Sequence, residues 1–113
     1  MLDGTDTPVE DTNPIPVFYC GVTRAYDHGR KTFFPAEAKT PAQELKSYTW
    51  NNAYAAFWER EIGSLAVGKL ADITVLDRDI MTVPEAQIPS ARVLYTIVGG
   101  KVRYEAPRPA PRR

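Results

Sequence analysis

A pair of glycines near the end of the chain constrains the fold more than any other feature. Val93–Val98 is rich in β-branched and aromatic residues, Gly99-Gly100 follows, and Lys101–Tyr104 alternates polar and apolar residues. Glycine adopts positive φ angles at little cost, so two glycines can join antiparallel strands by a tight turn. We therefore expect a β-hairpin here. A β-branched run within Ala71–Asp77 predicts a further strand, and residues 84–88 predict one helical turn.

Helical patterns occupy the first half of the chain. Asn13 can cap a helix that begins at Pro14 and ends near Arg24, because apolar residues recur there at helical spacing: Ile15, Phe18, Tyr19 and Val22. Residues 26–39 show no periodicity and are interpreted as a loop.

A second helical region is expected to start at Thr40, since Thr40 and Gln43 have the spacing of a capping box. Good capping residues at Thr49 and Asn51 divide this region into two short helices. Across the helical region as a whole, Leu45, Tyr48 and Asn52 fall on one face.

Composition excludes several classes of protein. Fourteen basic and fourteen acidic residues cancel, which gives no electrostatic case for binding nucleic acid or an anionic membrane. No apolar run is long enough to span a membrane, and residues 1–4 lack the features of a signal peptide, so a cytoplasmic location is expected. Cys20 is expected to be a buried, inert thiol. Residues 106–113 predict a disordered tail rich in proline and arginine.

Three stretches together resemble the metal-dependent amidohydrolase superfamily, in particular its third amidohydrolase group. Gly4-Thr5-Asp6-Thr7-Pro8 resembles the turn that follows the last barrel strand. Residues 49–53 and 63–77 resemble the return into the small β domain, and residues 93–102 resemble the closing hairpin. The match runs from Gly4 to Glu105 in the family's order.

The resemblance implies an α+β fragment. Residues 1–62 would be the C-terminal end of a (β/α)8 barrel with its last-strand active-site loop, and residues 63–105 would be part of a small composite β-sandwich. A barrel alone needs roughly 250 residues, so this chain is expected to be the C-terminal portion of such an enzyme. Open strand edges are then expected at residues 73–76 and 93–98, together with self-association or a complementing N-terminal chain.

Asp6 is the candidate site residue that the resemblance implies, both as the catalytic group and as a metal ligand. In the complete enzyme a divalent metal, with zinc expected, would activate water for attack on a non-peptide carbon–nitrogen bond of a small amide substrate. The chain alone is not expected to bind the metal stably or to be active, because a zinc site typically needs three protein ligands and the only histidine is His28. His28 is interpreted as a loop residue.

Other readings remain open at this point. A lone loop aspartate is more often a turn former than a catalyst, and Asp3, Glu10 and Asp11 lack the spacing of a calcium loop. The alternative function is a non-catalytic binding or assembly module that retains the small β domain. Arginines near the end of the chain favour nucleic-acid binding only weakly.

Overall fold

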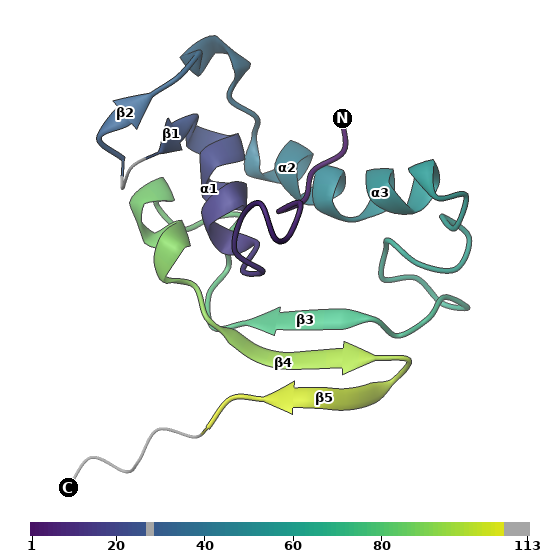
Figure 1. Cartoon of the computed structure of the whole chain (residues 1–113). Coiled ribbons are helices and arrows are strands. Elements are labelled where there is room, and N and C mark those ends of the chain that lie inside the picture. The colour runs from purple at the N-terminus through teal and green to yellow at the C-terminus, as the bar shows by residue number, and fades with distance from the viewer. Residues whose placement is uncertain (27–28, 108–113) are drawn as a thin grey trace, which may run out of the picture.

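The computed structural model describes residues 1–26 and 29–107, and it places a helical part above a three-stranded antiparallel sheet (Figure 1). A second, two-stranded sheet lies beside the helices. Helices and antiparallel strands are segregated, which confirms an α+β piece. His28 and the last six residues of the expected tail lie outside the described residues, so the two predictions made for them stay predictions.

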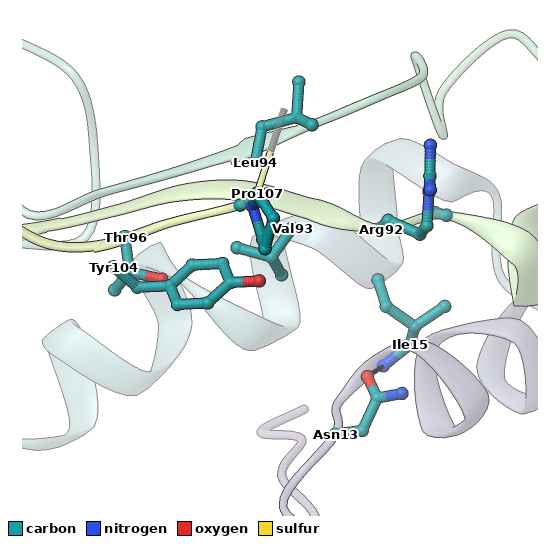
Figure 2. Close-up of a pocket in the computed structure, with 10 residues that line it drawn as sticks. Asn13, Ile15, Arg92, Val93, Leu94, Thr96, Tyr104 and Pro107 are labelled. Carbon is teal, nitrogen blue, oxygen red and sulfur yellow. Dashed lines mark hydrogen bonds between the residues drawn. The ribbon is translucent and has the colours of Figure 1, made fainter. Parts of the chain in front are cut away.

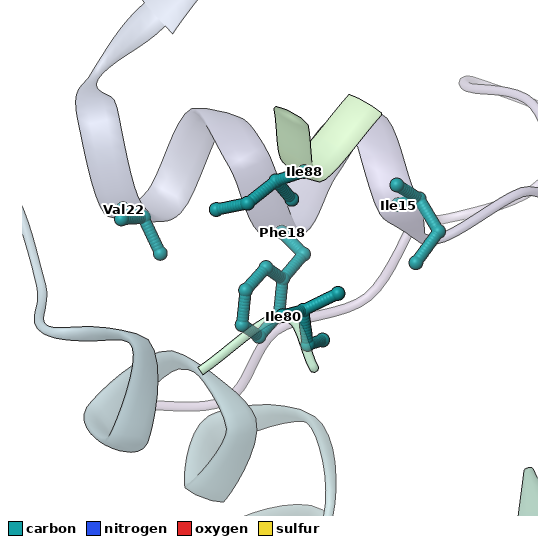
Figure 3. Packing of buried hydrophobic residues seen from close by; sticks show 5 residues of the cluster. All are labelled: Ile15, Phe18, Val22, Ile80 and Ile88. Atoms are coloured by element: carbon teal, nitrogen blue, oxygen red, sulfur yellow. The ribbon is translucent and has the colours of Figure 1, made fainter. Parts of the chain in front are cut away.

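Helix α1, Ile15–Thr23, supplies one side of the hydrophobic core. The N-cap is Pro14 and not the expected Asn13, although the Asn13 side chain accepts a hydrogen bond from the Ile15 N–H at 3.1 Å. Helix α1 buries apolar side chains against the segment between strands β3 (Ile73–Leu76) and β4 (Val93–Val98), and Figure 3 shows these residues together: Ile15, Phe18, Val22, Ile80 and Ile88. The expected helical periodicity is therefore confirmed, whereas Cys20 is half-buried and not fully buried.

Residues 25–37 are more regular than the loop that the sequence predicts. Strands β1 (Ala25–Tyr26) and β2 (Lys31–Thr32) pair antiparallel, and a 3-10 turn, η1, covers Pro35–Glu37. The prediction of a loop was wrong here because a two-residue strand is too short to show any hydrophobic alternation.

Helices α2 (Pro41–Tyr48) and α3 (Trp50–Ala55) follow in succession, which confirms the two short helices. The capping box is complete, with the Gln43 N–H donating to Thr40 Oγ1 and the Thr40 N–H donating to Gln43 Oε1. The buried face differs from the expected one. Glu44 and Ser47 are buried, whereas Leu45 is 39% exposed. The Glu44 carboxylate can be buried because Gly21 leaves space for it and Lys39 forms an ion pair with it.

Strands β3 (Ile73–Leu76), β4 (Val93–Val98) and β5 (Lys101–Glu105) form the larger sheet in the order β3-β4-β5. A two-glycine turn with φ angles of 56° and 75° joins β4 to β5, so the expected hairpin is confirmed. β4 was expected to expose an open edge, but it is the central strand, because β5 pairs with one side and β3 with the other. The open edges belong to β3 and β5. A 3-10 helix, η2 (Glu85–Ser90), precedes β4.

The segment from Gly63 to Asp72 joins α3 to the sheet through polar contacts. Lys69 Nζ donates to the Glu59 carbonyl at 2.5 Å, the Ile62 carbonyl at 3.1 Å and Ser64 Oγ at 2.7 Å. At the other end, Asp72 Oδ1 accepts from the Gly99 N–H at 2.7 Å. The lysine thus closes the turn after α3, and the aspartate fixes the hairpin turn of the sheet.

Candidate functional site

Asp6 lies in a tight turn of the N-terminal segment, with its φ angle at 50°. The Val9 N–H donates to the Asp6 carbonyl at 2.8 Å and closes the turn, while the hydroxyls of Thr5 and Thr7 lie 2.8 Å apart. A positive φ is tolerated by aspartate better than by most residues. The Asp6 side chain is exposed and accepts no hydrogen bond from any described residue, so its carboxylate is available to a ligand.

Two asparagines of α3 hold the segment that leads into this turn. Asn52 Nδ2 donates to the Asp3 carbonyl at 2.8 Å, and Asn51 Nδ2 donates to the Met1 carbonyl at the same distance. The partners are about fifty positions apart in the sequence, so these contacts fix the N-terminal segment against the start of α3. From the sequence, Asn51 was interpreted as a cap and Asn52 as part of a helix face, within the 49–53 stretch that carries the resemblance, and neither long-range contact was predicted.

An ion-pair chain reaches the same segment from the other side. Lys39 Nζ lies 2.5 Å from Asp3 Oδ2 and 2.8 Å from Glu44 Oε2. The side chain of Glu44 is only 1% exposed, and its Oε2 forms the ion pair without a well-aligned hydrogen bond. The lysine therefore connects a buried carboxylate of α2 to a partly exposed one in the N-terminal segment.

Burial and charge shift the acid–base properties of this cluster. Burial alone would lower the pKa of Lys39, but the hydrogen bond to Asp3 and the negative charges of Asp3 and Glu44 outweigh burial and raise that pKa. Burial raises the pKa of Tyr48 to about 12, and the carboxylates of Glu44 and Asp3 act in the same direction. Lys39 is thus held as a cation and Tyr48 as a neutral phenol over the whole physiological range.

The donor set of the described residues does not amount to a metal site. Among residues 1–26 and 29–107, no three His, Cys, Asp or Glu side chains gather in a way that could hold a metal ion. Asp6 is therefore a single candidate ligand, and no chemical step can be derived through a metal from these residues alone. Across the same residues, no helix is long and apolar enough to cross a membrane.

A groove of about 710 Å³ lies between the start of α1 and the three-stranded sheet. Figure 2 shows Asn13 and Ile15 on one side and Val93 and Tyr104 on the other. No carboxylate lines the groove, and Asp6 lies outside it. The groove is consequently distinct from the candidate catalytic turn.

Comparison with known proteins gives the family. The model of the Amidohydrolase family matches residues 2–104, which is nearly the whole chain. The chain belongs to the amidohydrolase family. This agrees with the resemblance drawn from the Asp6 turn, the 63–77 segment and the closing hairpin.

Three curated relatives of this amidohydrolase chain have informative names. N-substituted formamide deformylase of Arthrobacter pascens is 35% identical over 101 residues, covering 89% of this chain and 18% of the relative. Putative amidohydrolase YtcJ of Bacillus subtilis is 28% identical over 104 residues, covering 90% of this chain and 20% of the relative. The 5-methylthioadenosine/S-adenosylhomocysteine deaminase of Thermoanaerobacter pseudethanolicus is 37% identical over 76 residues, covering 67% and 17%.

This amidohydrolase chain therefore spans about a fifth of the length of these curated relatives. The family model and the names of these relatives are those of enzymes. The residues that sequence reasoning missed are Lys39, Glu44, Asn51 and Asn52. A lysine in an expected loop, and a glutamate and two asparagines on short helices, give no signal of burial or of long-range contacts, because such residues are usually solvated.

Proposed function

We propose that the chain is the C-terminal portion of an amidohydrolase that hydrolyses a non-peptide carbon–nitrogen bond, with Asp6 as its proton-transfer residue. The observation that carries the proposal is the exposed Asp6 carboxylate, which accepts no hydrogen bond from the described residues and sits on a turn whose approach is fixed by α3. A catalytic carboxylate needs this combination of availability and fixed position.

Hydrolysis requires Asp6 to act first as a general base and then as a general acid. As a general base, its carboxylate takes a proton from the water that attacks the carbonyl carbon. As a general acid, it then delivers that proton to the departing nitrogen, which leaves as an amine or as ammonia. One carboxylate can do both, because it is regenerated in its ionised form when the nitrogen departs.

The remaining requirements of the site lie beyond the described residues. We infer that a divalent metal, with zinc as the first candidate, is held mainly by histidines of an upstream segment, with Asp6 as a possible further ligand. That metal would supply activation of the attacking water. The names of the relatives suggest N-substituted formamides, 5-methylthioadenosine and S-adenosylhomocysteine as the first small-molecule substrates to test.

Exposed apolar side chains support a complementing N-terminal chain or self-association. Leu65, Val67 and Leu70 are exposed beside β3, and Val102 is exposed on the edge strand β5. An edge strand and contiguous apolar residues are features that pairing with further chain would cover.

The test is reassembly. The chain is co-expressed with an upstream amidohydrolase segment that carries a His-x-His pair, and bound zinc and hydrolysis of an N-substituted formamide are measured. We expect stoichiometric zinc and turnover, and we expect Asp6→Asn to abolish turnover. Glu10→Gln is the matched control, because it removes one exposed carboxylate from the same loop and should leave turnover intact.

Two results would contradict the proposal. A reassembled complex that binds zinc but keeps full activity with Asp6→Asn would exclude Asp6 as the proton-transfer group. Failure to bind metal or substrate in a complex that does assemble would favour the other candidate, a non-catalytic binding or assembly module. That candidate draws its support from the exposed apolar surface described above.

A further inference from the structure

Asp3 is held at two different atoms by two different parts of the chain. Its carbonyl oxygen accepts from Asn52 Nδ2 at 2.8 Å, and its carboxylate lies 2.5 Å from Lys39 Nζ. A contact at the backbone and one at the side chain fix both the position and the direction of a residue. Asp6 follows only three positions later, so fixing Asp3 limits where the turn can lie.

Lys39 is itself fixed by packed helices. Its backbone N–H donates to the Gly21 carbonyl of α1 at 3.0 Å, and its ammonium lies 2.8 Å from the buried Glu44 carboxylate of α2. A Cβ atom on Gly21 would lie 2.2 Å from Glu44 Oε1, so the carboxylate fits only against a glycine. The support of Asp3 therefore extends into the contact between two helices.

An ionic contact at this place is better explained by geometry than by stability. Burying a carboxylate and an ammonium costs desolvation that offsets most of their attraction, and an apolar pair of similar size could pack there as well. Unlike an apolar pair, Lys39 has donors left over after meeting Glu44, and one of them reaches Asp3. Lys39, paired with Glu44, thus fixes the position of the N-terminal segment relative to the two helices.

We propose that Lys39 and Asn52 are positioning residues for Asp6, acting through Asp3. The proposal rests on the function proposed above for Asp6, but it gives Lys39 and Asn52 a role that the resemblance does not imply. Neither side chain needs to touch substrate or metal. Their role is to keep the Asp6 carboxylate in one place while bonds are made and broken.

Asp3→Asn is the first variant to test, because it removes the charge that Lys39 meets and leaves the buried Lys39–Glu44 pair intact. Order parameters of the Thr5 and Asp6 amides are measured by NMR in the full chain. We expect them to fall from about 0.85 to below about 0.6, with the β4–β5 amides unchanged. Asn52→Ala should do the same, and Glu10→Gln should not.

Lys39 is tested directly by two substitutions. Lys39→Met should loosen the turn, whereas Lys39→Arg, which keeps the charge, should retain its order. In the reassembled enzyme, Asp3→Asn should lower kcat by roughly 10- to 100-fold with KM unchanged, since a displaced catalytic group costs turnover more than binding. A general loss of fold would instead lower the amount of active enzyme and the order of every strand.

The proposal is overturned if Asp3→Asn and Asn52→Ala both leave Thr5 and Asp6 as ordered as in the parent chain. It is also overturned if the turn loosens while kcat stays constant. Either result leaves the role of Asp6 untouched. Conversely, the order parameters do not depend on the rate of hydrolysis. If Asp6→Asn left hydrolysis unaffected, the proposed function would be refuted, but the measured order of the turn would stay the same.

Discussion

Gly63→Ala is expected to destabilise the protein through two separate effects. Gly63 has a φ angle of 84°, which an alanine adopts only with strain. In addition, a Cβ atom there would lie 2.6 Å from Ala53 Cβ and 3.1 Å from the Trp50 backbone. Ala53 is buried inside α3, so it cannot move away without displacing the helix.

The two effects have separate magnitudes. A left-handed backbone costs a non-glycine residue about 1–2 kcal/mol. Forcing a methyl group into a filled space typically costs about 1–3 kcal/mol more. Gly68→Ala is the matched control, because its φ angle is 90° but nothing lies within 4 Å of the added Cβ. We therefore expect the control to show only the backbone cost and Gly63→Ala to show both.

The assay is urea unfolding followed by tryptophan fluorescence, with the free energy of unfolding taken by linear extrapolation. Trp50 adjoins the perturbed site and Trp58 lies in the following turn. Ala53→Gly in the Gly63→Ala background should recover the part of the packing cost that is due to the Ala53 methyl group, less about 1 kcal/mol for a glycine within a helix. Equal destabilisation by Gly63→Ala and Gly68→Ala would refute the steric part of the reasoning.

The remaining predictions concern the segment from Gly63 to Asp72, which joins α3 to the sheet, and the sheet itself. Lys69→Met should lower the free energy of unfolding by about 1–3 kcal/mol, since three oxygens lose a charged donor; the exposed Lys101→Met should have little effect in the same urea assay, and equal losses would contradict the role of Lys69. Hydrogen bonds from Arg78 and Arg92 hold the pKa of Asp77 below its usual range. Its contribution to stability is thus present above roughly pH 4 and lost as pH falls further. Asp77→Asn should reduce the fall in the free energy of unfolding below this pH. If the free energy of unfolding fell equally with pH in the variant and the parent protein, the proposed contribution of Asp77 would be excluded.

Local chemistry explains which parts of the fold could be predicted from the sequence. The Gly99-Gly100 turn and the Thr40–Gln43 capping box involve neighbouring residues, so their patterns predict the observed geometry directly. The central place of β4 depends on which strands pair across some twenty residues, and the sequence pattern carries no such information.

The candidate site divides in the same way. The turn around Asp6 was recognisable because its residues are consecutive. Glu44 was not, since a glutamate on a short helix normally points to solvent, and its burial depends on Lys39 and on the missing side chain of Gly21. Asn52 donates to the Asp3 carbonyl 49 positions away, and no local sequence pattern predicts a contact at that separation.

The joint formed by Gly63, Lys69 and Asp72 bears on how relatives of this protein are found. Each of these residues answers a mechanical need: space against α3, closure of a turn, and attachment of a hairpin. The contacts that they make hold parts of the fold together. Similarity in this stretch therefore indicates that two parts of an architecture are coupled, and catalysis in any such relative has to be established from its histidines and carboxylates.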